Sequence, residues 1–215
     1  MKAIVIGSTG LVGRQIVQKL LDRDSVQEVL VFARRSLNLS HPKLIEEIVD
    51  FERIFEWEDR VRGDVLYSAF GTTLRAAHTK EKQFHIDHDY QLSVAKAAIQ
   101  NGVKTFVLIS TVNANPVSSF FYLRMKGQIE EQVKKLGFSS LSILRPGPLT
   151  GVREKPRLSE FFSTTILDVL SKLVKLDIEP VDSSLVADVA VEAGLVSQEG
   201  VRVITPQEIL SARNK

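Results

Sequence analysis

Short apolar runs alternate along this chain with longer segments of helical period. The apolar runs are rich in β-branched residues and lie at Lys2–Ile6, Val29–Phe32, Leu44–Val49, Val65–Ala69, Thr105–Ile109 and Ser140–Leu144. Continuous runs of this kind are typical of strands that are buried on both faces of a sheet. The alternation therefore predicts a parallel sheet flanked by helices, with connections long enough for right-handed crossovers.

The longest helical segments have clear ends. The pattern predicts helices at Leu11–Leu21, Phe84–Gln100 and Phe121–Leu136, and the last two are followed by Asn101 and Gly137. Asn and Gly directly after the last turn are ordinary signals for the end of a helix. The expected fold class is α/β, a Rossmann-type doubly wound parallel sheet with helices on both faces.

The pattern becomes less regular after Pro148. We expect a helix near Ser159–Lys175, another at Ser184–Val196 and a late strand at Val201–Ile204. A separate piece of about 65 residues would be only marginally stable alone. Residues 1–215 are therefore predicted to form a single domain, in which roughly residues 150–215 contribute a small cap on the substrate side.

Composition excludes several classes of protein. The 215 residues are 44% hydrophobic and 25% charged, as in ordinary soluble globular proteins, and none is cysteine. Disulfides, thiolate metal sites and cysteine nucleophiles are therefore excluded. The net charge of +2 and the lack of a long apolar stretch give no reason to expect nucleic acid or membrane partners. Because no signal-peptide core is recognisable, the expected location is cytoplasmic.

The first turn is rich in glycine. It joins the first strand to the first helix and reads Gly7, Ser8, Thr9, Gly10, Leu11, Val12, Gly13. In this spacing the first glycine permits a tight turn, the second lets the backbone approach a diphosphate, and the third lets the helix pack close to the sheet. Main-chain amides at the helix start would face the phosphates. The glycines could serve turn and packing alone, but their position directly after a buried strand favours a dinucleotide site.

The end of the second strand indicates the kind of dinucleotide. Sites for NAD often carry an acidic residue there, which binds the ribose 2′-hydroxyl. This strand is instead followed by Arg34 and Arg35. Because guanidinium groups can bind a 2′-phosphate bidentately, we expect NADP(H) to be favoured over NAD(H). The alternative is that both arginines are solvated loop residues.

A tyrosine and a lysine are candidates for catalysis. Tyr122 and Lys126 are four residues apart, on one face of the helix that follows the fifth strand. A neighbouring ammonium would lower the pKa of the tyrosine, which could then exchange a proton with a substrate hydroxyl or carbonyl. Ser110 and Thr111 follow the fifth strand, where side chains face the ligand crevice. Either hydroxyl could bind the substrate oxygen.

These residues carry a resemblance to a known group of proteins. The chain resembles the atypical short-chain dehydrogenases/reductases through about residue 162, and among them it is most similar to the Tat-interacting-protein-like NAD(P)-binding oxidoreductases. The closer match rests on residues 7–13, 32–35, 49–52, 70–73, 87–90, 121–123 with 126–127, and 144–147. The resemblance implies that Tyr122 and Lys126 are the active-site pair. It also implies coenzyme contacts from Asp50, Phe51, Ala69, Phe70, Gly71, Thr72, Pro146, Gly147, Pro148 and Leu149.

Two positions depart from the pattern of these proteins. Where many of them carry an asparagine in the helix before the fifth strand, this chain has Asp87, which puts an asparagine-dependent proton relay in doubt. The hydroxyl pair is Ser110-Thr111 where two serines are frequent. Thr111 keeps the hydroxyl but is stiffer at χ1.

Other polar or aromatic residues are given structural interpretations. His85 and His88 lie close to Asp87 and Asp89 in sequence, but a polar helix start is favoured over a metal site, and no metal is expected. Trp57 and its acidic neighbours are expected on a short surface helix.

Three functions are compatible with the sequence. The first is an enzyme, an NADPH-dependent reductase or dehydrogenase acting on an unidentified small carbonyl or alcohol, as a monomer or homodimer. The second is a non-catalytic, NADP(H)-sensing regulatory protein. The third is a sugar-nucleotide epimerase or dehydratase, which the short C-terminal third disfavours. The intact tyrosine–lysine pair favours the enzyme.

Overall fold

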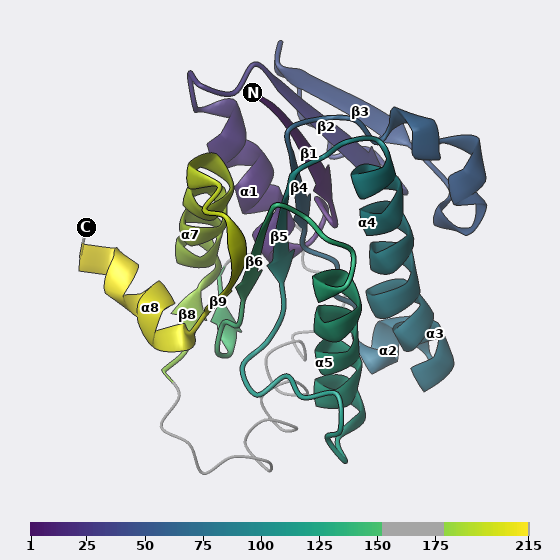
Figure 1. Cartoon of the computed structure of the whole chain (residues 1–215), viewed down its shortest axis with the longest axis vertical. Coiled ribbons are helices and arrows are strands. Elements are labelled where there is room, and N and C mark those ends of the chain that lie inside the picture. The colour runs from purple at the N-terminus through teal and green to yellow at the C-terminus, as the bar shows by residue number, and fades with distance from the viewer. Residues whose placement is uncertain (152–178, 215) are drawn as a thin grey trace.

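A seven-stranded parallel sheet forms the centre of the molecule (Figure 1). The computed structural model describes residues 1–151 and 179–214. The strands are β1 (Lys2–Ile6), β2 (Glu28–Ala33), β3 (Leu44–Ile48), β4 (Val65–Ser68), β5 (Thr105–Ile109), β6 (Ser140–Leu144) and β9 (Gly200–Ile204). Their order across the sheet is β3-β2-β1-β4-β5-β6-β9, and every neighbouring pair is parallel. This arrangement confirms the predicted Rossmann-type fold.

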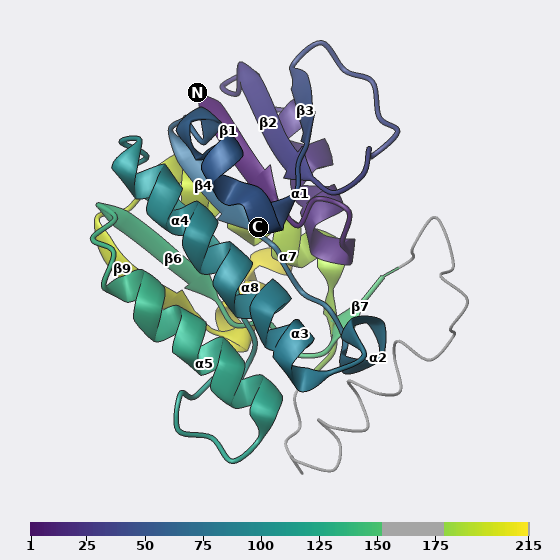
Figure 2. The ribbon, with the colours of Figure 1, turned by 90° about the vertical axis from the view of Figure 1, so that its right-hand side faces the viewer.

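Helices cover both faces of the sheet (Figures 1 and 2). One face carries α1 (Leu11–Leu21) and α7 (Ser183–Val196), and the other carries α4 (Tyr90–Gln100) and α5 (Phe121–Lys134). The shorter helical elements are η1 (Phe51–Glu56), η2 (Glu58–Arg60), α2 (Leu74–Ala77), α3 (Lys80–Phe84), η3 (His85–Asp89), α8 (Pro206–Ser211) and η4 (Ala212–Asn214). A separate parallel pair is formed by β7 (Leu149–Thr150) and β8 (Val181–Asp182). Among the described helices, none has the length and apolar character of a membrane span.

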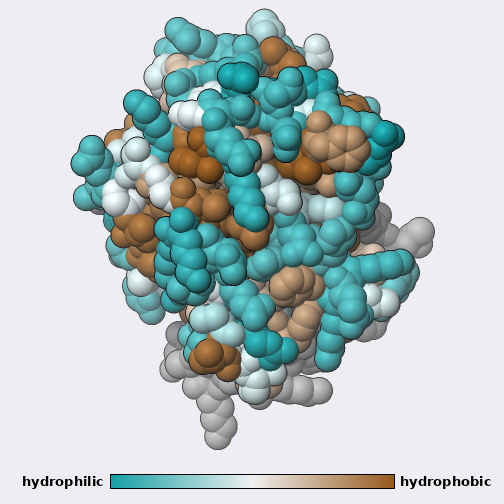
Figure 3. Space-filling view, turned by 45° about the vertical axis from the view of Figure 1, so that its right-hand side comes forward, coloured by the Kyte–Doolittle hydropathy of each residue, from teal (hydrophilic) through white to brown (hydrophobic). Residues whose placement is uncertain are grey.

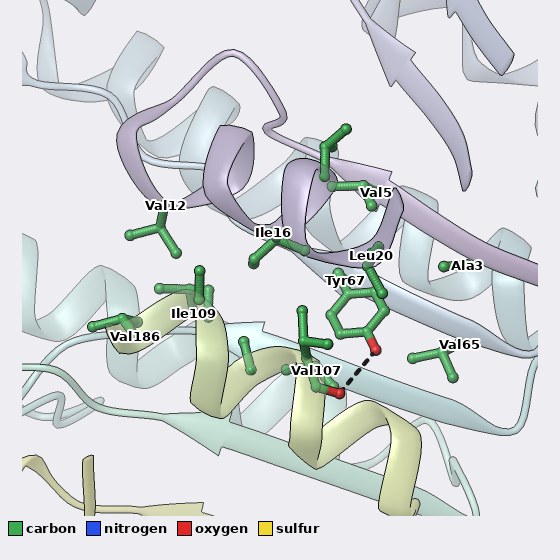
Figure 4. Close-up of a cluster of buried hydrophobic side chains, with 14 of the residues drawn as sticks. Ala3, Val5, Val12, Ile16, Leu20, Val65, Tyr67, Val107, Ile109 and Val186 are labelled. Atoms are coloured by element: carbon green, nitrogen blue, oxygen red, sulfur yellow. Dashed lines mark hydrogen bonds between the residues drawn. The ribbon is translucent and has the colours of Figure 1, made fainter. Parts of the chain in front are cut away.

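The central strands are apolar because both faces of the sheet are covered. In β1, Ala3 belongs to the core beneath α1 and α7, whereas Ile4 belongs to the core beneath α4 and α5. Successive side chains of a strand point to opposite faces, so two cores demand a continuous apolar run. Figure 4 shows the first core, where the Tyr67 hydroxyl donates a hydrogen bond to the Val191 carbonyl in α7 over 3.3 Å.

The expectation that every strand is buried on both faces is wrong for β3. This strand lies at the edge of the sheet, and its Ile45 and Ile48 are 44% and 57% exposed. Among the described strands β3 pairs only with β2, and an edge position of this kind suits the two glutamates between these isoleucines. The face of the molecule in Figure 3 carries apolar patches interrupted by hydrophilic side chains.

The helix predicted at Phe84–Gln100 is longer and less regular than expected. Helical structure runs from α3 through η3 to α4, and η3 is a π-helical turn. A π turn inserts an extra residue into the helix and so changes the direction of the following side chains. Hydrophobic periodicity does not reveal this insertion, because the apolar face resumes in α4.

Trp57 is not a surface residue. It lies between η1 and η2, but its side chain is only 2% exposed and stacks on Phe32 with ring centroids 4.8 Å apart. The indole N–H donates to the Asp50 carbonyl over 2.9 Å, which satisfies its polar atom inside the core. The acidic neighbours in sequence gave the misleading surface signal.

Residues 179–214, the described part of the expected C-terminal cap, form part of the main fold and its core. The predicted helix at Ser184–Val196 and strand at Val201–Ile204 are present as α7 and β9, each beginning one residue earlier. α7 packs against α1 and the central strands, and β9 extends the sheet beside β6. The helix predicted near Ser159–Lys175 lies outside the described residues.

Gly194 provides a test of this packing. A Cβ atom at position 194 would lie 2.1 Å from the Tyr67 hydroxyl oxygen and 2.6 Å from its ring carbon Cζ. In an unobstructed helix, replacing Gly with Ala stabilises a protein by about 0.5–1 kcal/mol. Here Tyr67 is fully buried and has little room to move. We predict that Gly194→Ala instead lowers the free energy of unfolding by about 1–3 kcal/mol, measured by urea denaturation.

Gly71→Ala is the matched control, because a Cβ atom there meets no atom within 4 Å. Equal or greater stability of Gly194→Ala would contradict the close contact between α7 and β4.

Candidate functional site

The candidate site lies where the strand order reverses. β1 has β2 on one side and β4 on the other, and such a reversal opens a crevice at the carboxyl ends of the strands. Gly7 follows β1 and has a φ of +76°, which favours glycine. A Cβ atom on Gly7 would also lie 2.4 Å from the main-chain carbonyl carbon of Ala69, after β4. Both the turn and the close contact therefore require glycine here.

The glycine loop forms a cradle suited to an anion. Gly10 donates its N–H to the Gly7 carbonyl over 3.0 Å, and a Cβ on Gly13 would lie 2.2 Å from that same oxygen. α1 begins after Gly10 with no side-chain cap and no acidic residue in its first turn. Its first amides can therefore bind an external anion. Ser8 is 1% exposed, and its hydroxyl has no hydrogen-bond partner among the described residues.

The remaining loop residues divide between solvent and core. Thr9 is exposed and Leu11 is half-buried, whereas Val12 packs into the core beneath α1. The Val12 side chain therefore packs α1 against the sheet. Only the main chain of Val12 is available to the predicted site.

The β2 side of the crevice brings together aromatic and charged residues from separate loops. Phe51, which follows β3, packs edge-to-face on Phe70, which follows β4, with ring centroids 5.1 Å apart. The Asp50 carboxylate caps η1 by accepting a main-chain N–H over 3.0 Å. Arg34 and Arg35 follow β2 and are exposed.

Arg34 lies near this aromatic group. The ring of Tyr90 packs against Phe51 with centroids 5.5 Å apart. Burial and a hydrogen bond to Glu52 raise the pKa of Tyr90, and the positive charge of Arg34 acts in the opposite direction. The charge of one of the two predicted arginines therefore acts on the aromatic group at the predicted adenine end.

The loop after β4 is held by polar side chains from the helical stretch that follows it. The Thr72 N–H donates to both carboxylate oxygens of Asp87, over 2.8 and 3.0 Å. The Gln83 side-chain amide donates to the Thr72 carbonyl over 3.0 Å. Gly71 is exposed at the centre of this loop. Sequence reasoning gave Asp87 and Gln83 no part in holding this loop, because Thr72 lies 15 and 11 residues away from them in sequence.

Lys126 binds the main chain at the carboxyl ends of two neighbouring strands, β4 and β5. Its side chain is buried, and its Nζ donates to the Phe70 carbonyl over 3.2 Å and to the Ile109 carbonyl over 3.3 Å. The lysine therefore joins the loop after β4 to the end of β5. Burial lowers the pKa of Lys126, and the negative charges of Asp87 and Glu130 act in the opposite direction.

Tyr122 is half-buried one turn before Lys126, and its side chain is hydrogen-bonded to Thr111. Burial raises the pKa of Tyr122, the charge of Asp87 adds to this effect, and the bond to Thr111 opposes it. The expectation that Lys126 would lower this pKa is therefore wrong. Desolvation of the phenolate is the largest contribution, and Lys126 is not among the groups that shift this pKa.

Ser110 and Thr111 have different surroundings. The Ser110 hydroxyl donates to Glu130, a residue only 1% exposed, which also accepts from Arg145 Nε over 3.0 Å and forms an ion pair with it. Ser110 is thus engaged inside the protein, while Thr111 faces Tyr122. The sequence did not single out Glu130, although its position four residues after Lys126 on the same helix was a usable signal.

The segment after β6 completes the same edge of the sheet. Pro146 and Gly147 are buried, Pro148 is half-buried, and Leu149 in β7 is 39% exposed. The Pro148 carbonyl accepts the Val181 N–H over 2.8 Å, which pairs β7 with β8. These predicted nicotinamide contacts therefore lie beyond the carboxyl end of β6, beside the end of β5.

The histidines near Asp87 lie within hydrogen-bonding distance of carboxylates. His85 contacts Glu52 and Asp89, each over 2.9 Å, and His88 contacts Asp89 over 2.8 Å. In residues 1–151 and 179–214, no group of three or more His, Asp or Glu side chains is arranged to hold a metal ion.

Solved structures share this fold. The structure described as MoeE5 in complex with UDP-glucose and NAD has a TM-score of 0.73 at 17% identity, with coverage of 98% of this chain and 80% of that one. The oxidoreductase ylbE from Lactococcus lactis has a TM-score of 0.70 at 20% identity, with coverage of 100% and 98%. At this level of identity, the similarity concerns the fold.

Fungal proteins are similar in sequence over most of the chain. Protein fmp52 of Aspergillus fumigatus is 35% identical, with coverage of 91% of this chain and 88% of its own length. Protein FMP52-1 of Scheffersomyces stipitis is 38% identical, with coverage of 93% and 90%. Both names carry the word mitochondrial. They overturn the cytoplasmic expectation, which rested only on the lack of a recognisable targeting segment.

A family model agrees with these similarities. The model described as HIM1 matches residues 61–177, more than half of the 215 residues. That range includes the loop after β4, the π turn and α5. The chain therefore belongs to the HIM1 family and is a relative of the fungal Fmp52 proteins.

Proposed function

We propose that this protein is an NADP(H)-dependent oxidoreductase of the short-chain type that acts on a small carbonyl compound or alcohol. The observation that carries the proposal is the position of two features at one edge of the sheet. The glycine cradle after β1 lies there, and so does the group of Tyr122, Thr111 and Lys126 at the end of β5. The finer sequence resemblance to the Tat-interacting-protein-like oxidoreductases supports the same class of reaction. The names of the fungal relatives favour a mitochondrial location.

The cradle fits the diphosphate of a dinucleotide. The positions of Gly7 and Gly13 have no space for a Cβ atom, and the buried Ser8 hydroxyl has no protein partner among the described residues. Main-chain amides at the start of α1 would hold the phosphates. Phe51 and Asp50 would lie by the adenine, and the loops 69–72 and 146–149 by the nicotinamide.

The site residues suit reduction of a carbonyl group. The coenzyme supplies a hydride to the carbonyl carbon when it is bound. Because burial raises the pKa of Tyr122, its phenol is protonated near neutral pH and can donate its proton to the carbonyl oxygen. The positive charge of Lys126 would then stabilise the resulting phenolate. Atoms and charge balance, since carbonyl, hydride and proton give an alcohol.

Thr111 is the better candidate for orienting the substrate oxygen. Its hydroxyl already faces Tyr122, whereas the Ser110 hydroxyl is used by the buried Glu130. We therefore propose that Thr111 binds the substrate oxygen and that Ser110 has a structural role, joining the end of β5 to α5.

Arg34 and Arg35 are proposed to select the phosphorylated coenzyme. Both are exposed, and the charge of Arg34 acts on Tyr90 in the aromatic group at the proposed adenine end. We predict that Arg34→Ala with Arg35→Ala weakens NADPH binding about tenfold or more, the worth of a charged hydrogen bond, and leaves NADH binding nearly unchanged. Isothermal titration calorimetry with each coenzyme measures both affinities.

Arg62→Ala is the control for loss of a positive charge, because Arg62 is exposed and bonds only locally, to the Asp59 carbonyl. Tighter binding of NADH than NADPH to the wild type would refute the assignment of the two arginines.

The proposed proton donor can be tested directly. We predict that Tyr122→Phe lowers turnover by roughly 10²–10⁴-fold, the usual contribution of a positioned acid, with NADPH affinity preserved. Consumption of NADPH with a panel of small aldehydes, ketones and quinones gives the rates. Unchanged turnover would remove Tyr122 from the mechanism.

The two strand-end hydroxyls give a matched pair of variants. We predict that Thr111→Val lowers turnover about tenfold or more, because it removes the hydroxyl beside Tyr122 without changing the side-chain shape. Ser110→Ala should keep turnover within a few-fold and lower the unfolding temperature, because Glu130 loses a buried donor. A greater loss of turnover in Ser110→Ala than in Thr111→Val would instead assign the substrate oxygen to Ser110.

The same assays separate the alternative functions. Protection of the protein against thermal unfolding by UDP-glucose, beyond that given by coenzyme, would favour a sugar-nucleotide reaction. Coenzyme binding without turnover of any probe would favour a sensor.

A further inference from the structure

Asp87 is a buried carboxylate with no part in the reaction proposed above. It lies in the π turn η3, and its side chain is fully buried. Both of its oxygens accept the Thr72 N–H, at 2.8 and 3.0 Å. π turns inside longer helices often occur at functional sites because they redirect side chains. Here the redirected side chain reaches the loop that lines the candidate site.

The main chain around Asp87 is fixed to the end of β4. The Gln91 side-chain amide donates to the Asp87 carbonyl, and its oxygen accepts the Ser68 hydroxyl over 2.7 Å. Gln83 holds the Thr72 carbonyl from the other side. The carboxylate therefore has a defined position relative to both β4 and the following loop.

The charge of Asp87 acts on α5. η3 packs against α3, α4 and α5, and among the titratable groups of these helices, Lys126 and Tyr122 of α5 interact with it. Gln83 of α3 contributes a neutral hydrogen bond. The two titratable residues that follow in η3, His88 and Asp89, pair with each other.

The charge of Asp87 also acts on Lys126. Its ammonium group is buried and hydrogen-bonded to two main-chain carbonyls. The negative groups that act on it are Asp87 and Glu130, and Glu130 is already paired with Arg145. Asp87 is therefore the carboxylate whose charge is left to balance Lys126.

The hydrogen bonds of Asp87 do not explain why it is charged. A neutral amide oxygen would accept the Thr72 N–H equally well. Burial raises the pKa of Asp87 to about 6, and the positive charge of Lys126 only partly offsets this. The ionised carboxylate therefore lowers stability as the pH rises through that value. The negative charge of Asp87 therefore does not serve stability, and its effect is on the candidate functional site.

We propose that Asp87 is a positioning residue whose negative charge keeps the buried Lys126 protonated while its oxygens hold the Thr72 loop beside it. The inference deepens the proposed function, on which it rests for the role of Lys126 in turnover. As the pH falls through about 6, Asp87 takes up a proton and Lys126 loses its counter-charge. Turnover should fall over the same interval.

The protonation of Lys126 can be followed without catalysis. In the full chain labelled with ¹³C-lysine, the pH titration of the Lys126 side-chain resonance gives its pKa by NMR. We expect Asp87→Asn to lower that pKa by about one unit, because an opposite charge is removed and the hydrogen bond to Thr72 is kept. In the wild type, the same resonance should show a smaller inflection near pH 6, where Asp87 titrates.

Asp89→Asn is the matched control. It removes a carboxylate from the same π turn, but one that faces His85 and His88. It should leave the pKa of Lys126 unchanged. With NADPH and the most active carbonyl probe, the wild type and Asp89→Asn should lose turnover below about pH 6, whereas Asp87→Asn should have lower turnover and no inflection in that interval.

The outcomes distinguish the two proposals. An unchanged Lys126 pKa in Asp87→Asn, or a wild-type resonance with no inflection near pH 6, overturns the role of Asp87. The second measurement needs no variant and so does not depend on the folding of Asp87→Asn. Failure of the wild type to bind either coenzyme would overturn the proposed function, and the NMR titration would still decide the relation between Asp87 and Lys126.

Discussion

The close approach of three backbone segments at the carboxyl end of β1 is the constraint on which the candidate site depends. Gly7 touches the main chain after β4, and Gly13 touches the carbonyl of Gly7. A Cβ atom at either position would overlap these main-chain atoms, so the segments would have to move apart. Because the contacts involve main-chain atoms, they cannot be relieved by a change of rotamer. The cradle at the start of α1 is therefore built by the same glycines that let the fold close.

A second group of contacts joins the opposite side of the crevice. Lys126 binds the carbonyls of Phe70, near the start of the loop after β4, and of Ile109, at the end of β5, and Asp87 binds the amide of Thr72. Glu130 connects Ser110 to Arg145 directly beneath. Burying these ionisable groups costs stability unless each is paired and hydrogen-bonded. Asp87, Lys126 and Glu130 are buried ionisable groups, and their side chains all lie towards the carboxyl ends of the strands.

The range matched by the HIM1 family model covers several of these contacts. The matched range, residues 61–177, includes the β4 loop, η3 and the start of α5, where Asp87, Tyr122 and Lys126 lie. The part of the chain shared with the family is thus the part that forms the proposed nicotinamide side. The glycine cradle lies outside that range, but the fungal relatives are similar over nine-tenths of the chain.

The sequence by itself determined the sheet, the glycine turn and the spacing of Tyr122 and Lys126, because these depend on local periodicity and on short-range backbone requirements. It could not determine that β3 is an exposed edge or that Trp57 is buried, because both depend on which segments pack alongside. Only the tertiary structure separated Ser110 from Thr111, since the choice rests on Glu130, twenty residues away in sequence. It also reversed the expected direction of the Tyr122 pKa, because desolvation depends on the whole surroundings of a group rather than on one neighbouring charge.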